Sequence, residues 1–174
     1  MSDALLPSPG QTIGPFFRYG LEFKDGGNLK ESTSPGAVRL YGQIFDGAGE
    51  PVPDALIEIW QTNAKGAIPE EEGSFHRDGI TFTGWGRVHT SELGEYEFWT
   101  EEPGASFFAV VIFARGLTDR LHTRIYLPER ADDALLNGLS EDERETLVAV
   151  RTSEGLRHDI HLQGAGETVF LAFR

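Results

Sequence analysis

Turn-forming residues divide this chain into short segments, and that spacing constrains its fold more than any other feature. Its 174 residues include 21 glycines and nine prolines, spread along the chain rather than gathered in one region. Between them lie short apolar and aromatic runs at roughly ten-residue spacing, the pattern of an all-β sandwich. The sequence therefore predicts an all-β fold, a β-sandwich with one short helix and long decorating loops.

The expected strands differ in how their apolar residues are arranged. In residues 55–60, Ala55, Ile57 and Ile59 share one face, which is the period of a half-buried strand. Residues 106–116 read SFFAVVIFARG, which is too apolar for a half-exposed strand and predicts a central strand covered on both faces. Further strands are expected at residues 38–45, within 81–90, and at 96–100, 123–127, 156–162 and 167–173.

One helix is expected, and Ser140 caps it. Glu143 stands at the capping-box position, and acidic residues fill the first turn of SEDERETLVAV. Residues 62–77 have no period and predict a long surface loop, a kind of segment that often carries function. Since no linker separates two domains, we expect an N-terminal arm and lead-in over residues 1–36 and one sandwich domain over residues 37–174.

The charge balance and the missing cysteines exclude several classes of function. Fifteen basic residues against 28 acidic ones give a net charge of −13 at pH 7, which repels nucleic-acid backbones and anionic membranes. Without cysteine there are no disulfides, no thiolate catalysis, no iron–sulfur clusters and no cysteine-ligated zinc. The first residues, MSDALLPSPG, do not resemble a signal segment. We therefore expect a cytoplasmic protein that binds neither nucleic acid nor membrane.

The five histidines are the first candidates for chemistry. His158 and His161 are three residues apart, so a strand puts them on opposite faces and favours solvated or edge positions over a metal site. A metal site built from these two and His122 stays an alternative. His76 lies beside glutamates 70–72, where a solvated charge run is favoured over a surface metal. His89 and His122 are expected to satisfy hydrogen bonds locally.

Two features are not explained by a plain sandwich. Residues 10–20, GQTIGPFFRYG, form an aromatic-rich arm that must dock on its own domain or on a partner to stay soluble. Arg115 ends the most apolar strand. A guanidinium there either pairs with a nearby acid or captures a carboxylate ligand in bidentate fashion.

Four stretches resemble the intradiol ring-cleavage dioxygenases and follow one another in that family's order. They are PSPGQTIGPFF, PVPDALIEIWQTNAKG, FARGLTDRLHTRIYLPE and LRHDIHLQGAGETVF. The resemblance covers about residues 7–173 and is strongest to the alpha subunit of the two-subunit members. It implies a transthyretin-like β-sandwich and an enzyme that inserts oxygen between the two hydroxyl-bearing carbons of a catechol.

The family holds a non-haem ferric iron with two tyrosines and two histidines, and the resemblance implies that this chain lacks all four. Phe107 and Ala109 stand where the histidine pair would be, and Phe75 is the nearest match to one tyrosine. The loop that would carry the other tyrosine, after Pro103, is nearly deleted. The resemblance therefore implies Fe(III) on a partner beta subunit, with no catalytic or metal-binding residue in this chain.

The resemblance also implies that this chain completes the substrate cavity of the beta subunit. The residues that would face or line this cavity are Thr12, Gly14, Pro15, Phe16 and Arg115. Arg115 would lie near the carboxylate of 3,4-dihydroxybenzoate. Two departures could alter the pocket wall, namely the short connection after Pro103 and His158 in place of an aromatic residue.

The resemblance implies a hetero-oligomer of many alpha–beta protomers, in which this chain by itself is inactive. The alternative is a stand-alone transthyretin-like binding module without catalysis.

Overall fold

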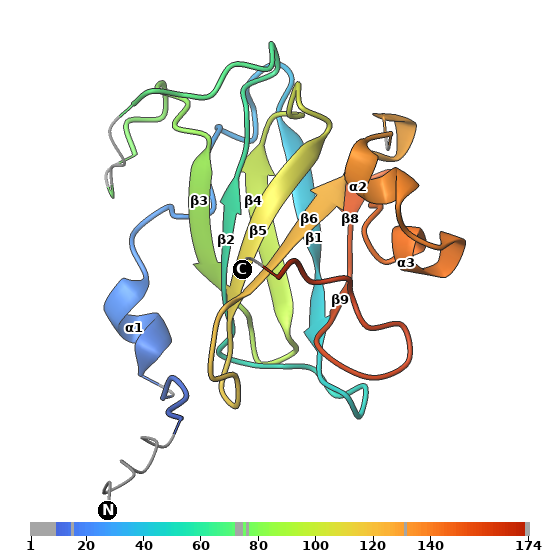
Figure 1. Ribbon diagram of the computed structural model, residues 1–174. Helices are drawn as coiled ribbons and strands as arrows, with labels where there is room; N and C mark the ends of the chain where they lie inside the picture. Colours follow the sequence, from blue (N-terminus) through green and yellow to red (C-terminus); the bar gives the residue numbers. More distant parts are fainter. Residues whose placement is uncertain (1–9, 15, 72–74, 76, 131, 173–174) are drawn as a thin grey trace, which may run out of the picture.

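The computed structural model describes residues 10–14, 16–71, 75, 77–130 and 132–172, which form two β-sheets packed face to face (Figure 1). One sheet has the order β4-β1-β8-β7, with the short β9 paired to β1, and the other has the order β3-β2-β5-β6. The strands are β1 (Val38–Phe45), β2 (Leu56–Trp60), β3 (Trp85–His89), β4 (Glu95–Thr100), β5 (Phe107–Phe113), β6 (Leu121–Tyr126), β7 (Val150–Thr152), β8 (Gly155–Arg157) and β9 (Ile160–His161). The predicted all-β sandwich is confirmed.

Alternation along the strands builds the core between the two sheets. In β2, Ile57 and Ile59 are fully buried, and in β5 Val110 and Ile112 face the same interior. Phe98 of β4 reaches this core from the facing sheet. Each such side chain contributes roughly 1.5–3 kcal/mol by leaving water, so the inward faces hold the sandwich together.

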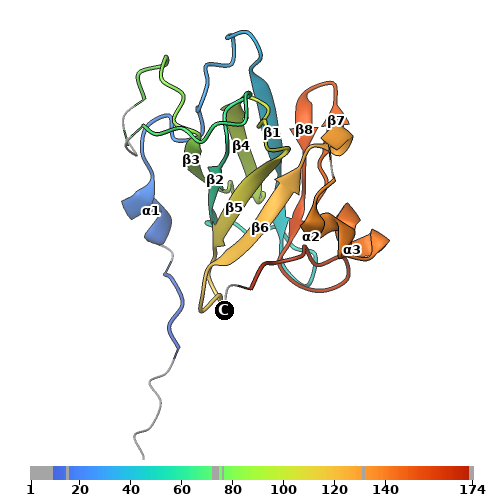
Figure 2. The ribbon, with the colours of Figure 1, turned by 45° about the horizontal axis from the view of Figure 1, so that its top comes forward.

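The apolar strand β5 lies between β2 and β6, as its sequence predicts. The expectation that both of its faces are covered is wrong, because its outward residues are only half-buried. Phe113 packs on Phe17 and Phe107 packs on Tyr126, each with ring centroids 5.5 Å apart. Between these two contacts, no helix in the described part of the chain covers the outer face of β5 (Figure 2).

The last two predicted strands differ from the structure. Residues 156–162 split into β8 and β9, because the carboxylate of Asp159 replaces a backbone acceptor and takes a hydrogen bond from the Gln43 amide at 3.1 Å. The described residues of 167–173 are not a strand. This segment makes single contacts instead, such as the hydrogen bond from the Leu171 amide to the His122 carbonyl at 2.7 Å.

The expectation of a single helix is wrong, because the described residues contain three short α-helices and one 3-10 helix. The predicted start of the helix after Ser140 is correct. The capping box is present, with Ser140 and Glu143 each accepting a hydrogen bond from the other's backbone amide. The helix it starts, α3 (Glu141–Glu145), ends early because Leu147 is buried in a second small core against Tyr126. The other short helices are α1 (Phe17–Leu21), α2 (Ala134–Asn137) and the 3-10 helix η1 (Pro128–Arg130).

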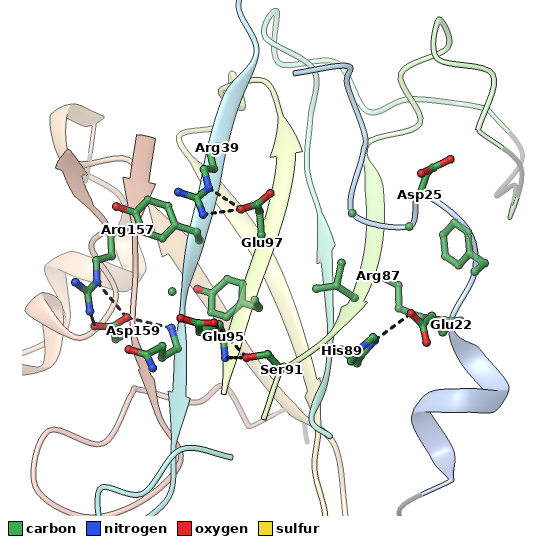
Figure 3. Close-up of a pocket in the computed structure, with 18 residues that line it drawn as sticks. Glu22, Asp25, Arg39, Arg87, His89, Ser91, Glu95, Glu97, Arg157 and Asp159 are labelled. Carbon is green, nitrogen blue, oxygen red and sulfur yellow. Dashed lines mark hydrogen bonds and ion pairs between the residues drawn. The ribbon is translucent and has the colours of Figure 1, made fainter. Parts of the chain in front are cut away.

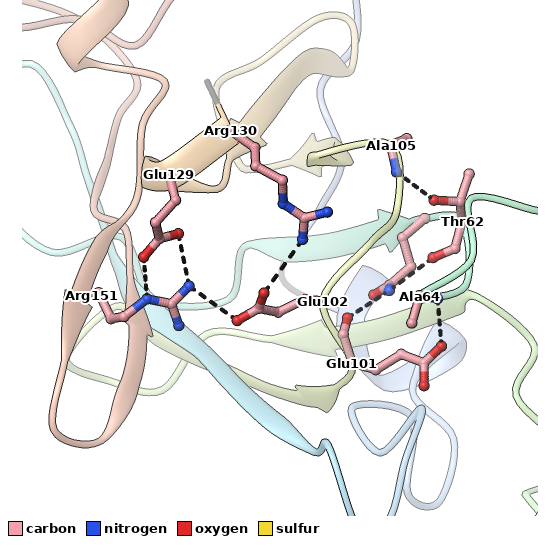
Figure 4. A network of polar contacts seen from close by, with 9 residues as sticks. Thr62, Ala64, Glu101, Glu102, Ala105, Glu129, Arg130 and Arg151 are labelled. Carbon is pink, nitrogen blue, oxygen red and sulfur yellow. Dashed lines mark hydrogen bonds and ion pairs between the residues drawn. The ribbon is translucent and has the colours of Figure 1, made fainter. Parts of the chain in front are cut away.

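The segment between β2 and β3 has neither helix nor strand among its described residues, as predicted. Polar contacts tie it to the short connection after β4 (Figure 4). The amide of Ala64 donates to the Glu101 carboxylate at 2.8 Å, and the amide of Ala105 donates to the Thr62 hydroxyl at 3.0 Å. The shortened connection after Pro103 therefore has its backbone donors satisfied by the neighbouring loop.

Among the described helices, none has the length and apolar character needed to cross a lipid bilayer.

Candidate functional site

Arg115 lies at one end of the sandwich, just after β5. It lines a hollow of about 300 Å³ together with the turn after β1 and with Leu117. Its side chain is half exposed, and its Nη2 lies 3.3 Å from the Asp54 carboxylate. Both sequence interpretations of Arg115 thus remain open, since it pairs with an acid and still presents part of its guanidinium to solvent.

The N-terminal arm runs past the same end of the sandwich. Gln11 and Ile13 line a second hollow of about 220 Å³, and Leu117 lines both this hollow and the one that contains Arg115. Arg18 of α1 extends to Asp54, with its Nη1 2.7 Å from the carboxylate. The structure therefore brings the arm and Arg115 to one end of the fold, although they are about a hundred residues apart in sequence.

The arm residues predicted to face a substrate are open to solvent in this chain. Thr12 and Gly14 are exposed, and Phe16 is 80% exposed. Pro15 lies outside the described residues. Because these side chains do not enclose a cavity with Arg115 within the described chain, their predicted role needs a second surface to complete the site.

The outward positions of β5 are unsuited to a ferric ion. Phe107 and Ala109 pair with Tyr126 and Arg124 of β6. The guanidinium of Arg124 lies over the Phe107 ring at 4.1 Å and pairs with the Asp133 carboxylate at 3.0 Å. A guanidinium has no acceptor atom to offer a metal ion, and here it packs against the place where a ligand would have to stand.

The tyrosines do not compensate for the missing histidines. Tyr126 donates its hydroxyl proton to Asp133 at 2.7 Å, and burial together with this bond raises its pKa to about 12. Tyr96 is buried, which raises its pKa, and it donates to the carbonyl of His158. Tyr41 shares a hydrogen bond with Thr152, and Tyr19 is exposed on α1. A phenolate ligand needs an ionised and accessible oxygen, so these residues do not fit the family's iron site.

Among the residues that the structure describes, no three His, Cys, Asp or Glu side chains gather so that they could hold a metal ion. The expectation of a solvated or edge position for His158 is wrong. This side chain is only 4% exposed because it sits under the loop that follows α3, with its Nε2 3.0 Å from the Thr146 carbonyl. Its Nδ1 is buried without a hydrogen-bond partner, and burial lowers its pKa to about 4.

The other histidines behave as ordinary structural residues. His122 accepts a hydrogen bond from Arg120 at 3.0 Å, which confirms the prediction of local bonding for this residue. His89 instead approaches a distant segment, with its Nδ1 3.3 Å from the Glu22 carboxylate. His161 stacks on Phe45 with a centroid distance of 5.1 Å. His76 lies outside the described residues.

A hollow of about 610 Å³ lies on the outer side of β1 and β4, away from Arg115 (Figure 3). Some of its charged side chains pair with one another. Arg39 binds Glu97 at 2.6 Å, and Arg157 binds Asp159 at 2.9 Å. Five acidic side chains and three arginines line this hollow, so it suits an anionic ligand less than the end of the sandwich does.

Sequence reasoning missed the polar residues whose partners come from distant segments. Asp54 and Arg18 carry no motif, and their meeting depends on how α1 docks beside β2 and β3. Arg77 was also missed. It anchors the long loop by donating to the Trp85 carbonyl at 2.6 Å and to the Thr83 hydroxyl at 2.7 Å. A Pro-Asp turn before an apolar strand was the available signal for Asp54, but it does not identify a partner.

Comparisons with known proteins define the class. A family model described as Dioxygenase matches residues 14–111. Solved structures with the same fold include the dioxygenase domain of a carbohydrate-binding fusion from Streptomyces sp. SirexAA-E, at a TM-score of 0.55 and 22% identity over 89% of this chain and 96% of that one. A hydroxyquinol 1,2-dioxygenase from Pseudomonas putida DLL-E4 also has a TM-score of 0.55, at 16% identity over 88% of this chain and 65% of that one. The fold is thus that of the dioxygenase β-sandwiches.

Sequence similarity extends over the full length. The protocatechuate 3,4-dioxygenase alpha chain of Pseudomonas putida is 34% identical, covering 97% of this chain and 98% of the relative. A protocatechuate 3,4-dioxygenase beta chain, from Burkholderia cepacia, is 29% identical over 86% of this chain and 77% of the relative. The chain belongs to the intradiol ring-cleavage dioxygenase family of oxidoreductases and is a dioxygenase subunit.

Proposed function

We propose that this chain is the non-iron-binding alpha subunit of a protocatechuate 3,4-dioxygenase. It completes the substrate cavity of a beta subunit that holds Fe(III). The complex cleaves 3,4-dihydroxybenzoate with one molecule of O₂ to give 3-carboxy-cis,cis-muconate, so both oxygen atoms enter the product. In this proposal the iron supplies the oxygen chemistry, and Arg115, Thr12, Gly14, Pro15 and Phe16 bind and orient the substrate.

One observation carries the proposal. The outward side chains of β5, where the family's histidine pair would fall, are Phe107 and Ala109, and the cation of Arg124 lies against them. A chain with full-length similarity to alpha chains, whose described residues hold no cluster of metal ligands, is suited to work beside an iron-bearing chain. The curated beta chain that resembles it is a natural model for such a partner.

The exposed aromatic residues of the arm support a protein partner. Phe16 is 80% exposed and Tyr19 is 62% exposed, and their rings lie 6.3 Å apart on the same short segment. Large apolar groups gathered on a surface favour a protein interface. A hetero-oligomer of alpha–beta protomers, an arm that ends near residue 36 and a cytoplasmic location belong to the same proposal.

The test is to produce the chain alone and together with a beta subunit. Alone, we expect less than about 0.1 iron per chain and no ring cleavage, because the donor set does not fit iron. Co-produced, we expect a stable complex with iron that converts 3,4-dihydroxybenzoate. An isolated chain that is fully loaded with iron and opens the ring would overturn the proposal. A stable chain that binds no beta subunit would instead favour the stand-alone binding module.

A further inference from the structure

The carboxylate of Asp54 lies between two arginines that come from distant parts of the chain. Arg18 of α1 approaches one oxygen at 2.7 Å, and Arg115 approaches the other at 3.3 Å. The two contacts differ in burial as well as in length. The Arg18 side chain is 14% exposed and the Asp54 side chain 19%, whereas the Arg115 side chain is 50% exposed. The contact of Asp54 with Arg18 is the shorter and the more buried of the two.

The backbone conformation at Asp54 does not by itself require an aspartate. Its φ is +65°, in the left-handed region that glycine and asparagine adopt at least as easily. An asparagine would fill the same space and tolerate the same turn. What the aspartate adds is a negative charge at the point where the two guanidinium groups meet.

The three side chains together carry one negative and two positive charges, so the group has a net charge of +1. Because the contact with Arg18 is the shorter and more buried one, most of the carboxylate's charge is balanced there. Arg115 therefore keeps a large part of its positive charge, and its exposed side faces the hollow of about 300 Å³. Without Arg18, the carboxylate would pair fully with Arg115 and cancel it.

We infer that Arg18 is a positioning residue that acts through Asp54: it neutralises this carboxylate and so keeps Arg115 available for the carboxylate of an aromatic acid. The inference rests on the proposed substrate role of Arg115 and goes beyond it, because it assigns the preference for an acidic ring substituent to a three-residue unit. It also gives the docked arm a part in substrate selection.

The test uses the co-produced alpha–beta complex and two substrates, 3,4-dihydroxybenzoate and the uncharged catechol. Arg18→Gln should raise KM for the acid about threefold to fivefold, the size expected for a partly exposed ion pair. Both kcat and the KM for catechol should stay unchanged, because catechol has no carboxylate to bind. A rise in KM for both substrates would assign Arg18 a merely structural role and overturn the inference.

A double substitution distinguishes an effect of charge balance on KM from an effect of arm docking on KM. In Arg18→Gln/Asp54→Asn the carboxylate that would cancel Arg115 is gone, so KM for the acid should return at least to the wild-type value and match that of Asp54→Asn. Failure to return contradicts the inference. Arg18→Lys should keep the wild-type KM. Glu92→Gln, which removes an exposed carboxylate within Coulombic range of Arg18, is the matched control and should change neither KM.

Two further variants keep the outcomes distinct. If Arg115→Gln leaves KM for the acid unchanged, the proposed substrate role fails and this inference fails with it. If Arg115→Gln raises that KM while Arg18→Gln does not, only the present inference fails. Should Arg18→Gln prevent assembly, Asp54→Asn alone decides, since it leaves the arm intact: KM for the acid should fall, and an unchanged or raised value overturns the inference.

Discussion

The guanidinium carbon of Arg124 lies 4.1 Å from the centre of the Phe107 ring. This contact fills the outer face of β5 at the two positions where the resemblance to the dioxygenases predicts the histidine pair of iron-binding members. Arg124 is held there by Asp133, which also accepts a hydrogen bond from the Tyr126 hydroxyl. These positions are therefore filled by packed side chains whose charges balance. They are not a metal site that has merely lost its ion.

Restoring the two histidines should not restore a metal site. In Phe107→His/Ala109→His the new imidazoles gain no phenolate partner, because the hydroxyl of Tyr126 stays protonated next to Asp133. We expect less than about 0.1 ferric ion per chain and no phenolate-to-iron absorption band. Iron analysis and visible spectroscopy on the isolated chain measure both. Stoichiometric iron in this variant would show that Arg124 does not exclude the ion.

Removing the arm should affect pairing more than folding. Phe17 is the arm residue that packs on the sandwich, against Phe113, while Phe16 remains exposed. A chain that lacks residues 1–17 should lose no more than about 2 kcal/mol of unfolding free energy, since the aromatic contact that the described residues of this segment lose is only half-buried. It should, however, fail to co-purify with a beta subunit.

Phe16→Ser/Tyr19→Ser is the matched control for the arm deletion, because it leaves the backbone and Phe17 in place. It should weaken pairing without changing the unfolding free energy. Urea unfolding and co-purification distinguish the two effects. A truncated chain that assembles normally would show that the arm serves its own domain.

The strands were predictable where two independent signals agree. Residues 38–45 are rich in large residues and the Asp46-Gly47 turn follows directly, and both ends of β1 match the prediction. The helix after Ser140 had a correct start because its cap is local. Its end depends on the burial of Leu147 against Tyr126, a contact with another strand that local sequence does not encode.

The candidate site was predictable only in part, for a related reason. Arg115 stands out in sequence, as the one charge that directly follows a long apolar run. Its partner Asp54 and the second cation, Arg18, are brought together by the docking of α1, so no spacing rule connects them. Ion pairs between distant segments require the tertiary structure, whereas turns, caps and alternation do not.

Acidification should destabilise the fold through His158. Its pKa is lowered by burial to about 4, while the unfolded chain titrates near 6.5. Folding thus disfavours the protonated ring. The free energy of unfolding should be unaffected by this group above pH 6.5, fall by about 3 kcal/mol as the pH drops to 4, and change no further below that.

The variant His158→Phe isolates this contribution from those of its neighbours Asp159 and His161. The phenyl ring cannot gain a proton, so the variant should show a shallower loss of stability between pH 6.5 and 4. Urea unfolding at half-unit pH intervals gives the comparison. Equal slopes for the two proteins would assign the acid sensitivity to other groups.

The last prediction concerns Gly42, where β1 passes the break between β8 and β9. A Cβ atom at this position would lie 1.8 Å from the carbonyl oxygen of His158, far inside van der Waals contact. That oxygen cannot retreat easily, because it accepts a 2.6 Å hydrogen bond from the buried hydroxyl of Tyr96. Gly42→Ala should therefore cost at least about 3 kcal/mol of unfolding free energy.

Gly20→Ala is the matched control, because a Cβ atom there meets nothing within 4 Å. It should change the unfolding free energy by less than about 1 kcal/mol. In Gly42→Ala/Tyr96→Phe the carbonyl is released from its hydrogen bond, so the double variant should be more stable than the sum of the two single losses implies. Strict additivity would mean that the steric conflict is relieved elsewhere, by movement of β1 rather than of the His158 carbonyl.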